Sequence, residues 1–164
     1  MPSAPLIDIE SLLQPIPGDV PSGVRVPGDI VDKLREKRID DPEVERHSDW
    51  EGIVKLATQT LQETSKDLDL AVRLTEALVK FQEEQAASQN TPFAGVRDGL
   101  RLLRELAENC WDRLHPQIED DDLEVRLLPF DWLDEVDRGA YFPPTVRSIP
   151  LLLSPHAYTT YRGN

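Results

Sequence analysis

The fold is decided by one segment, residues 48–116, which reads SDWEGIVKLATQTLQETSKDLDLAVRLTEALVKFQEEQAASQNTPFAGVRDGLRLLRELAENCWDRLHP. Apolar residues recur through it at every third or fourth position, the spacing that places them on one face of an α-helix. Between residues 50 and 115 there are 11 leucines but only 5 valines and isoleucines together, and this balance also favours helix over sheet. The predicted core comprises Ile53, Ala57, Leu61, Leu74, Leu78, Leu100, Leu103, Ala107 and Trp111.

Start and stop signals divide this segment into three predicted helices. Ser48 followed by Glu51 has the pattern of a capping box at the start of the first helix. The polar run Ser65–Asp67 interrupts the apolar spacing and starts the second helix. Thr91-Pro92 has the pattern of a cap followed by a first-turn proline, and Pro116 is expected to end the third helix.

Shorter elements are predicted on both sides of the segment. Leu6–Leu13 is expected to be a short helix capped by Asp8, and Asp29 can cap another. An amphipathic helix after residue 119 is expected to be interrupted at Pro129, and the Pro-rich stretch from residue 142 onward is expected to be extended.

Together these patterns predict an all-α fold, a single helical bundle of about five to seven helices with an extended, Pro-rich C-terminal segment. A length of 164 residues suggests one domain. We place the helical domain at residues 1–158 and interpret residues 159–164 as the start of a linker or a disordered tail.

The charge of the chain limits its partners. The formal net charge is −13 and the sequence pI is near 4.6. Proteins that bind nucleic acid neutralise phosphates with Lys and Arg, so this chain is expected to repel nucleic acid and anionic lipid headgroups alike. No stretch approaches the ~18 apolar residues of a membrane span, and the first residues lack the basic region of a signal peptide. The expected location is therefore the cytoplasm.

A search for catalytic or metal-binding patterns predicts none. The single cysteine, Cys110, lies on an apolar helical face and is expected to be a buried packing residue. The histidines lack zinc-ligand spacing, and His115 is expected to cap a helix end. Asp120–Glu124 lacks the glycine and the spacing of a calcium loop. We therefore predict no enzyme activity, no cofactor and no metal, and expect Gly95 and Gly99 to permit close helix packing.

The candidate binding residues lie in the acidic stretch from Glu119 to Asp137, which holds nine acids and one base, Arg126. Such a stretch would speed encounter with a basic partner, and an aromatic residue within it would supply lasting affinity. Trp50 and Trp111 are predicted to be core residues, whereas Trp132 could be core or an exposed anchor. The candidate partner-binding residues are Phe130, Trp132, Asp120, Asp121 and Asp122.

The order of motifs resembles that of a known family. SKDLDLA at residues 65–71 is followed, about forty residues later, by CWDRLHP at residues 110–116, and Trp132-Leu133 comes after both. This order resembles the ImpA N-terminal domain, found in the TssA proteins of bacterial type VI secretion systems, over roughly residues 6–158. The resemblance implies an all-helical, non-catalytic, cytoplasmic domain that contacts baseplate, sheath or inner-tube proteins during assembly of the contractile tail.

The resemblance also implies that full-length relatives form rings through a C-terminal region beyond this domain. We therefore expect the chain alone to be monomeric or weakly dimeric, and its high net charge also opposes self-association. No functional residue of the family transfers to a position of this sequence. Two other functions remain open: a helical adaptor or regulator unrelated to secretion, and a di-metal helical enzyme, for which Asp112–His115 is the nearest sequence match.

Overall fold

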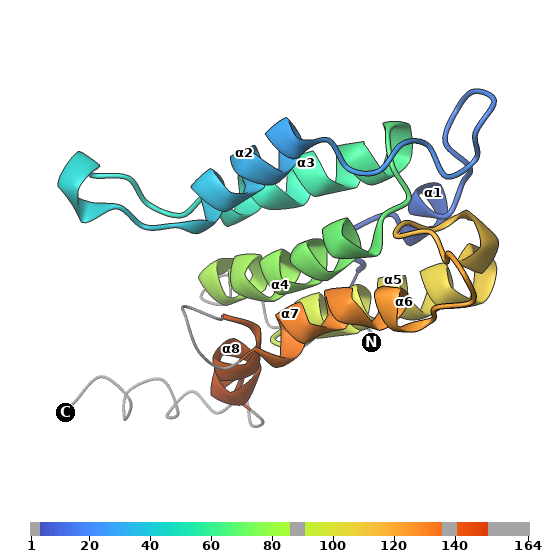
Figure 1. Cartoon of the computed structure of the whole chain (residues 1–164). Helices are drawn as coiled ribbons and strands as arrows, with labels where there is room; N and C mark the ends of the chain where they lie inside the picture. The colour runs from blue at the N-terminus through green and yellow to red at the C-terminus, as the bar shows by residue number, and fades with distance from the viewer. Residues whose placement is uncertain (1–3, 86–90, 136–140, 151–164) are drawn as a thin grey trace.

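The computed structural model describes residues 4–85, 91–135 and 141–150, and helices dominate this part of the chain (Figure 1). Its longer helices are α2 (Gly28–Arg38), α3 (Trp50–Glu63), α4 (Leu68–Gln85), α5 (Ala94–Asn109) and α8 (Phe142–Ser148). Its short elements are α1 (Ile9–Leu12), α6 (Glu124–Leu127), α7 (Asp131–Asp134) and the 3-10 turns η1 (Pro42–Val44), η2 (Trp111–Arg113) and η3 (Leu128–Phe130). The described residues contain isolated β-bridges but no strand, so the predicted all-α fold is confirmed.

The central helix of the bundle is α4. It contacts α3 and α5, and the later elements η3, α7 and α8 also lie against it. Figure 1 shows α2 and α3 as an upper layer, with α4 below it and α6 and α7 in line below α4. Eleven of the 18 residues of α4 are buried, which is the pattern of a helix covered on nearly all sides.

Six of the nine predicted core residues are buried: Ile53, Ala57, Leu61, Leu74, Leu78 and Leu103. The other three predictions are wrong, because Leu100, Ala107 and Trp111 are exposed. All three lie in α5 or directly after it. The apolar spacing therefore identifies the third helix correctly and Leu103 on its inner face, but it places Leu100 and Ala107 on that face wrongly.

The true inner face of α5 is marked by glycines. A Cβ atom at Gly95 would overlap the backbone of Leu78, and one at Gly99 would overlap the side chain of Thr75. The two helices pack closely at these glycines, as predicted, and this contact rotates Asp98 into the interior, where it is 2% exposed. The same face carries the buried Leu102, Leu103 and Leu106 in its second half. Because glycine carries no side chain, a pattern of large apolar residues misses the first half of the face.

Trp111 lies beyond the end of α5. The helix ends at Asn109, and Trp111 begins the 3-10 turn η2. The Trp111 side chain is 40% exposed, and the guanidinium of Arg126 lies over its ring at 4.6 Å from the ring centroid. Trp50, by contrast, is 2% exposed and is a core residue as predicted.

Helix starts agree with the sequence signals to within a residue or two. Asp49, not Ser48, is the N-cap of α3, and its carboxylate accepts a hydrogen bond from the Gly52 amide at 2.8 Å. Asp8 caps α1 as predicted, accepting from the Ser11 amide at 3.3 Å. Both aspartates satisfy amides that have no partner inside the helix.

The proline-rich stretch that begins at Phe142 is helical, not extended, up to Ser148. Pro143 and Pro144 lie in the first turn of α8, where a backbone N–H has no helical partner and the fixed φ of proline suits a helix. Ile149, directly after α8, has extended backbone as predicted. Residues 151–158 of the predicted extended segment and the predicted boundary at residue 158 lie outside the described residues. In the part that is described, no helix is both long and apolar enough to cross a membrane.

Candidate protein-docking surface

The acidic stretch folds into a helical run along the outside of α4. This α6–α7 run, residues 124–134, joins α6, η3 and α7, and its backbone stays right-handed helical through the two junctions at Leu128 and Asp131. Pro129 is accommodated because it lies in the first turn of η3. The run begins after Asp122, whose carboxylate accepts from the Glu124 amide at 2.9 Å.

One end of the run is fixed by Arg126, which is 2% exposed. Its guanidinium donates three hydrogen bonds to backbone carbonyl oxygens: Nε to Pro116 at 2.6 Å, Nη1 to Trp111 at 2.9 Å and Nη2 to Leu114 at 3.1 Å. Burial lowers the pKa of this guanidinium, with Asp112 acting in the opposite direction. The only base of the acidic stretch is therefore engaged inside the fold and does not offset the acids on the surface.

The other end of the run is fixed by Trp132. Its indole Nε1 donates to Glu76 Oε2 at 3.2 Å, and the guanidinium groups of Arg38 and Arg73 lie 4.6 Å and 4.0 Å from its ring centroid. The Glu76 carboxylate, 2% exposed, also accepts from Nε and Nη2 of Arg38, both at 2.9 Å. Trp132 is thus half-buried against the core, with much of its ring already in contact with the rest of the domain.

The outer face of the run is apolar. Leu123, Leu127 and Leu128 are 57%, 62% and 62% exposed, and Phe130 is 37% exposed. Leu123, Leu127 and Phe130 are spaced four and three residues apart, so a helical run places them on one side. Single exposed leucines are ordinary, but several on one face are typical of an interaction surface.

Exposed carboxylates precede this apolar face in the chain and are interspersed with it. Every acid of the described part of the stretch is exposed: Glu119, Asp120, Asp121, Asp122, Glu124, Asp131, Asp134 and Glu135. The surface therefore combines exposed leucine side chains with a strong negative potential. An apolar centre with a charged rim is the usual composition of a protein interface.

Two hollows lie beside the run. The first, of about 390 Å³, is lined by Arg25, His115, Pro116, Gln117, Glu119, Asp122 and Val125. The second, of about 370 Å³, is lined by Arg38, Asp69, Leu128, Pro129, Asp131, Trp132 and Glu135. Their linings meet where Arg25 of the first hollow forms an ion pair with Asp69 of the second, at 3.0 Å.

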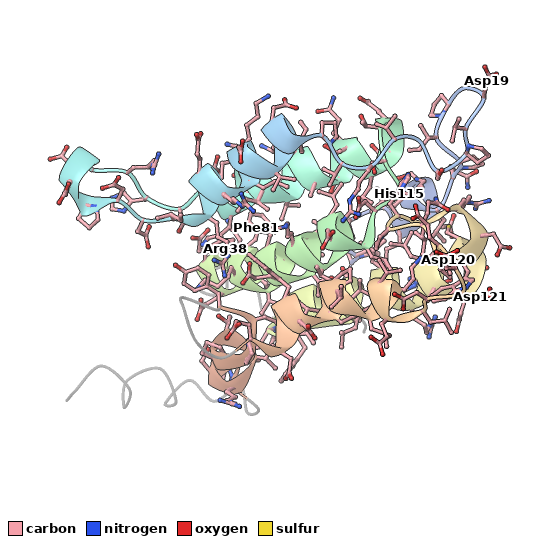
Figure 2. All side chains as sticks on the ribbon, in the orientation of Figure 1. Asp19, Arg38, Phe81, His115, Asp120 and Asp121 are labelled. Atoms are coloured by element: carbon pink, nitrogen blue, oxygen red, sulfur yellow. The ribbon has the colours of Figure 1, made fainter. Side chains whose placement is uncertain are left out.

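The structure places the predicted binding residues at different points of this surface. Asp120 and Asp121 lie at the end of the bundle near His115, in a turn where their φ angles are +52° and +58° (Figure 2). Phe130 is exposed on the run, whereas Trp132 faces inward and lines the second hollow.

Sequence reasoning missed the three exposed leucines on and beside the run. The i, i+4 spacing of Leu123 and Leu127 is a usable signal, but it equally suggests a buried helix face. Only the position of Arg126 and Trp132 on the inner side shows which face is outside.

The two family-like motifs form a structural junction. Lys66 is completely buried, and its ammonium donates to the carbonyl oxygens of Leu12 at 2.6 Å and Leu61 at 2.7 Å. Burial lowers the pKa of this ammonium to about 8. His115 does not cap a helix end, contrary to prediction; its amide donates to the Lys66 carbonyl at 2.7 Å and its Nε2 lies 3.2 Å from the Gly23 carbonyl oxygen. These residues hold loops together, which explains the motifs without any catalytic role.

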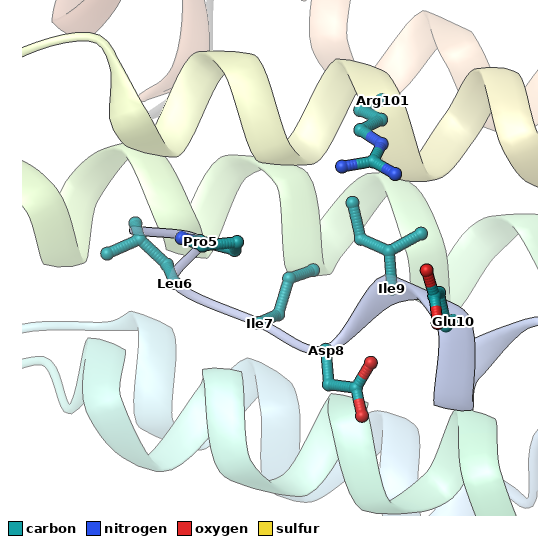
Figure 3. Close-up of a pocket in the computed structure, with 7 residues that line it drawn as sticks. All are labelled: Pro5, Leu6, Ile7, Asp8, Ile9, Glu10 and Arg101. Atoms are coloured by element: carbon teal, nitrogen blue, oxygen red, sulfur yellow. The ribbon is translucent and has the colours of Figure 1, made fainter. Parts of the chain in front are cut away.

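Two further places show no chemistry of their own. A hollow of about 410 Å³ lies between the N-terminal segment and Arg101 of α5. In Figure 3 the Asp8 carboxylate points away from Arg101, and it accepts the capping hydrogen bond from the Ser11 amide. Cys110 is buried, as predicted, with its sulfur 3.5 Å from the Leu13 carbonyl oxygen. Among the described residues, no three His, Cys, Asp or Glu side chains gather closely enough to hold a metal ion.

Comparison with known proteins agrees with the fold and the motifs. The family model described as ImpA, N-terminal, type VI secretion system, matches residues 13–135, a range that includes both motifs and the whole α6–α7 run. The chain therefore belongs to the ImpA N-terminal family of type VI secretion system proteins. No curated protein matches it.

A solved structure extends this result. The chain is similar to the N-terminal domain, including the conserved ImpA_N region, of the TssA component of the type VI secretion system from Burkholderia cenocepacia. The identity is 33% and the TM-score is 0.61, over 81% of this chain and 49% of the solved one. The chain thus spans about half the length of the solved TssA chain that it matches.

Proposed function

We propose that this chain is a non-enzymatic protein–protein interaction domain of a TssA-type component, and that it helps assembly of the contractile tail and baseplate by docking another secretion-system protein. The similarity to a TssA N-terminal domain supports the choice of system. The candidate partners are baseplate, sheath and inner-tube proteins, and the expected location is the cytoplasm. The domain by itself is expected to be a monomer or a weak dimer.

The observation that carries this proposal is the exposed apolar face of the α6–α7 run and the carboxylates interspersed with it. Burying a leucine side chain contributes about 1.5–3 kcal/mol, so the three exposed leucines together offer roughly 4.5–9 kcal/mol toward offsetting the losses on association. The carboxylates would attract a basic partner and orient it before contact. The leucine side chains are more than half exposed, and Asp122 both adds to the negative charge and accepts the hydrogen bond at the start of the run.

The two contributions can be separated by kinetics. Asparagine at Asp120, Asp121 and Asp122 is expected to slow association and to flatten its dependence on salt, with little change in dissociation. Leu127→Ala is expected to speed dissociation by about tenfold, because its side chain is an exposed anchor that the fold does not need. Trp132→Ala is expected to lower the melting temperature as well as affinity, since Trp132 contacts Glu76 and Arg38.

Pull-downs of baseplate, sheath and tube proteins with the isolated domain identify the partner, and surface-based kinetics on that pair measure both effects. Asp19→Asn is the matched charge control, since Asp19 is exposed on a loop away from the run (Figure 2). If none of these proteins binds the domain, or if Leu127→Ala leaves dissociation unchanged, the proposed docking function is wrong.

A further inference from the structure

A fourth hollow lies at the C-terminal end of α4, where that helix meets α8 (Figure 1). Its volume is about 220 Å³. Three segments supply its walls: Val79, Gln82 and Glu83 of α4, Pro92 near the start of α5, and Ile149 and Pro150 directly after α8. None of the described residues that line it belongs to the α6–α7 run, so it is a separate place on the surface.

Gln82 leaves one polar atom unsatisfied at this hollow. The residue is 2% exposed, and its Nε2 donates to Thr91 Oγ1 at 3.3 Å. Its Oε1 is buried without a hydrogen-bond partner among the described residues. Buried amide oxygens are nearly always hydrogen-bonded, because leaving one without a donor costs free energy. Since the terminal torsion of glutamine has a broad range, a small rotation brings Oε1 toward a donor that enters the hollow.

The other polar groups at the rim already have partners. The Glu83 carboxylate pairs with the ammonium of Lys80 and lies 3.4 Å from Ser148 Oγ. The Ser148 hydroxyl donates to the Thr145 carbonyl oxygen at 2.7 Å. The remaining walls, formed by Val79 and by the residues on either side of them in space, are apolar. A ligand that fits this hollow therefore needs an apolar body and a single hydrogen-bond donor for Gln82.

Size and donor count together select one side chain. Pockets for drug-sized ligands enclose about 300–1,000 Å³, so this smaller hollow suits a single large side chain. Indole has an apolar bicyclic body, one N–H donor and no acceptor. A phenylalanine ring would leave Oε1 without a donor, a tyrosine hydroxyl would bring an acceptor that also needs a partner, and a lysine or arginine would bury a charge. Tryptophan matches the hollow best.

We propose that this hollow binds a tryptophan side chain of a partner protein, with the ring against the apolar walls and the indole N–H donated to Gln82 Oε1. A tryptophan that fills a pocket and satisfies its N–H there is typical of an interface hot spot. The inference goes beyond the proposed function, because it assigns a second binding site that needs neither the leucines nor the carboxylates of the α6–α7 run.

Two capped tripeptides test the hydrogen bond directly. The first is glycine–tryptophan–glycine. In the second, benzofuranylalanine replaces tryptophan, so that an oxygen takes the place of the indole N–H while the shape is kept. Each is titrated into the ¹⁵N-labelled full chain, and binding is expected to shift the backbone amides of Val79 and Ile149 and the side-chain amide of Gln82. The tryptophan peptide is expected to bind about fivefold more tightly than its benzofuran analogue.

Variants of the lining separate the hydrogen bond from the apolar contact. Gln82→Leu keeps a side chain of similar size without the acceptor, and it is expected to bind the two peptides equally. Ile149→Ala is expected to weaken both peptides about threefold and to keep the fivefold preference, because it removes apolar wall only. Leu127→Ala is the control and is expected to change neither affinity, since Leu127 is an exposed leucine that does not line the hollow.

Several results would overturn the inference: no shift with either peptide, equal affinity of the unmodified chain for both, a preference that survives Gln82→Leu, or shifts centred outside the hollow. Binding of free indole without binding of the tryptophan peptide would assign the hollow to a small molecule instead. Shifts of the same amides on raising the protein concentration alone would assign it to a second copy of the chain. If Gln82→Leu does not fold, the comparison of the two peptides and Ile149→Ala still decide. The docking function is tested separately, by the tail-protein pull-downs and the kinetics of Leu127→Ala.

Discussion

Glu76→Gln tests how the C-terminal elements are held on the bundle. The Glu76 carboxylate is 2% exposed and accepts four hydrogen bonds, two from Arg38, one from the Trp132 indole at 3.2 Å and one from the Tyr141 amide at 3.4 Å. Glutamine keeps the shape of the side chain but removes its charge and replaces one acceptor oxygen with a donor. Arg38 then loses the charge of the buried carboxylate that it contacts.

The expected loss follows from these contacts. Removing one partner of a buried ion pair costs about 3–5 kcal/mol. The Arg38 side chain is 17% exposed and retains some access to water, so the lower end of this range, about 3 kcal/mol, is expected. In urea, with a slope of roughly 1.5–2 kcal/mol per molar, the unfolding midpoint would fall by about 1.5–2 M.

Urea unfolding followed by far-UV circular dichroism measures this loss. Glu83→Gln is the control, because Glu83 is exposed on the same helix, where it pairs with Lys80 and accepts a hydrogen bond from Ser148 Oγ at 3.4 Å; it should cost at most about 1 kcal/mol. In the double variant Glu76→Gln, Arg38→Met, the loss of stability should be smaller than the sum of the two single losses by about 2 kcal/mol, because both charges of the pair are then removed. A loss for Glu76→Gln as small as that of Glu83→Gln would refute the account of how the α6–α7 run is anchored.

Three other predictions concern the core and its pH dependence. Trp111→Ala should destabilise the domain by about 1 kcal/mol rather than the 3–5 kcal/mol of a buried tryptophan, because the ring is 40% exposed and mainly stacks on Arg126; thermal unfolding decides between these values. Gly95→Ala should cost about 1–3 kcal/mol, since its Cβ would overlap the backbone of Leu78, and an unchanged melting temperature would place the α4–α5 contact elsewhere. Burial lowers the pKa of Lys66 to about 8 in the folded chain, so the unfolded chain, with a lysine pKa of ~10.4, binds the proton more tightly. The free energy of unfolding should therefore rise as the pH is raised from 8 to about 10.4, and this rise should be absent in Lys66→Met. Equal pH slopes in the two proteins would show that Lys66 is not buried as described.

The sequence predicts the helices of the bundle better than their faces. The faces of α3 and α4 follow from large apolar residues, and Ile53, Ala57, Leu61, Leu74 and Leu78 are buried as predicted. The inner face of α5 depends instead on Gly95 and Gly99, whose contribution is the absence of a side chain. Spacing alone could not show that Leu100 would face solvent.

The candidate surface was only partly predictable for a similar physical reason. The acids can be read from the sequence because charge needs no structural context, and those among the described residues are exposed. Whether Leu127 or Trp132 faces outward depends on which residues of the bundle contact the inner side of the α6–α7 run, and those residues come from distant segments of the chain. Glu76, which holds Trp132, is 56 residues away in the chain.

The most direct test of the central claim is the footprint of the bound tail protein on this domain, measured by amide hydrogen exchange on the partner pair identified by pull-down. Docking on the α6–α7 run predicts that binding slows exchange within residues 119–135 and around the Arg25–Asp69 pair, and leaves α5 unchanged. The outer side of α5, with exposed Phe93 and Leu100, is the rival apolar surface. Protection confined to α5, with residues 119–135 exchanging as in the unbound domain, would contradict the account.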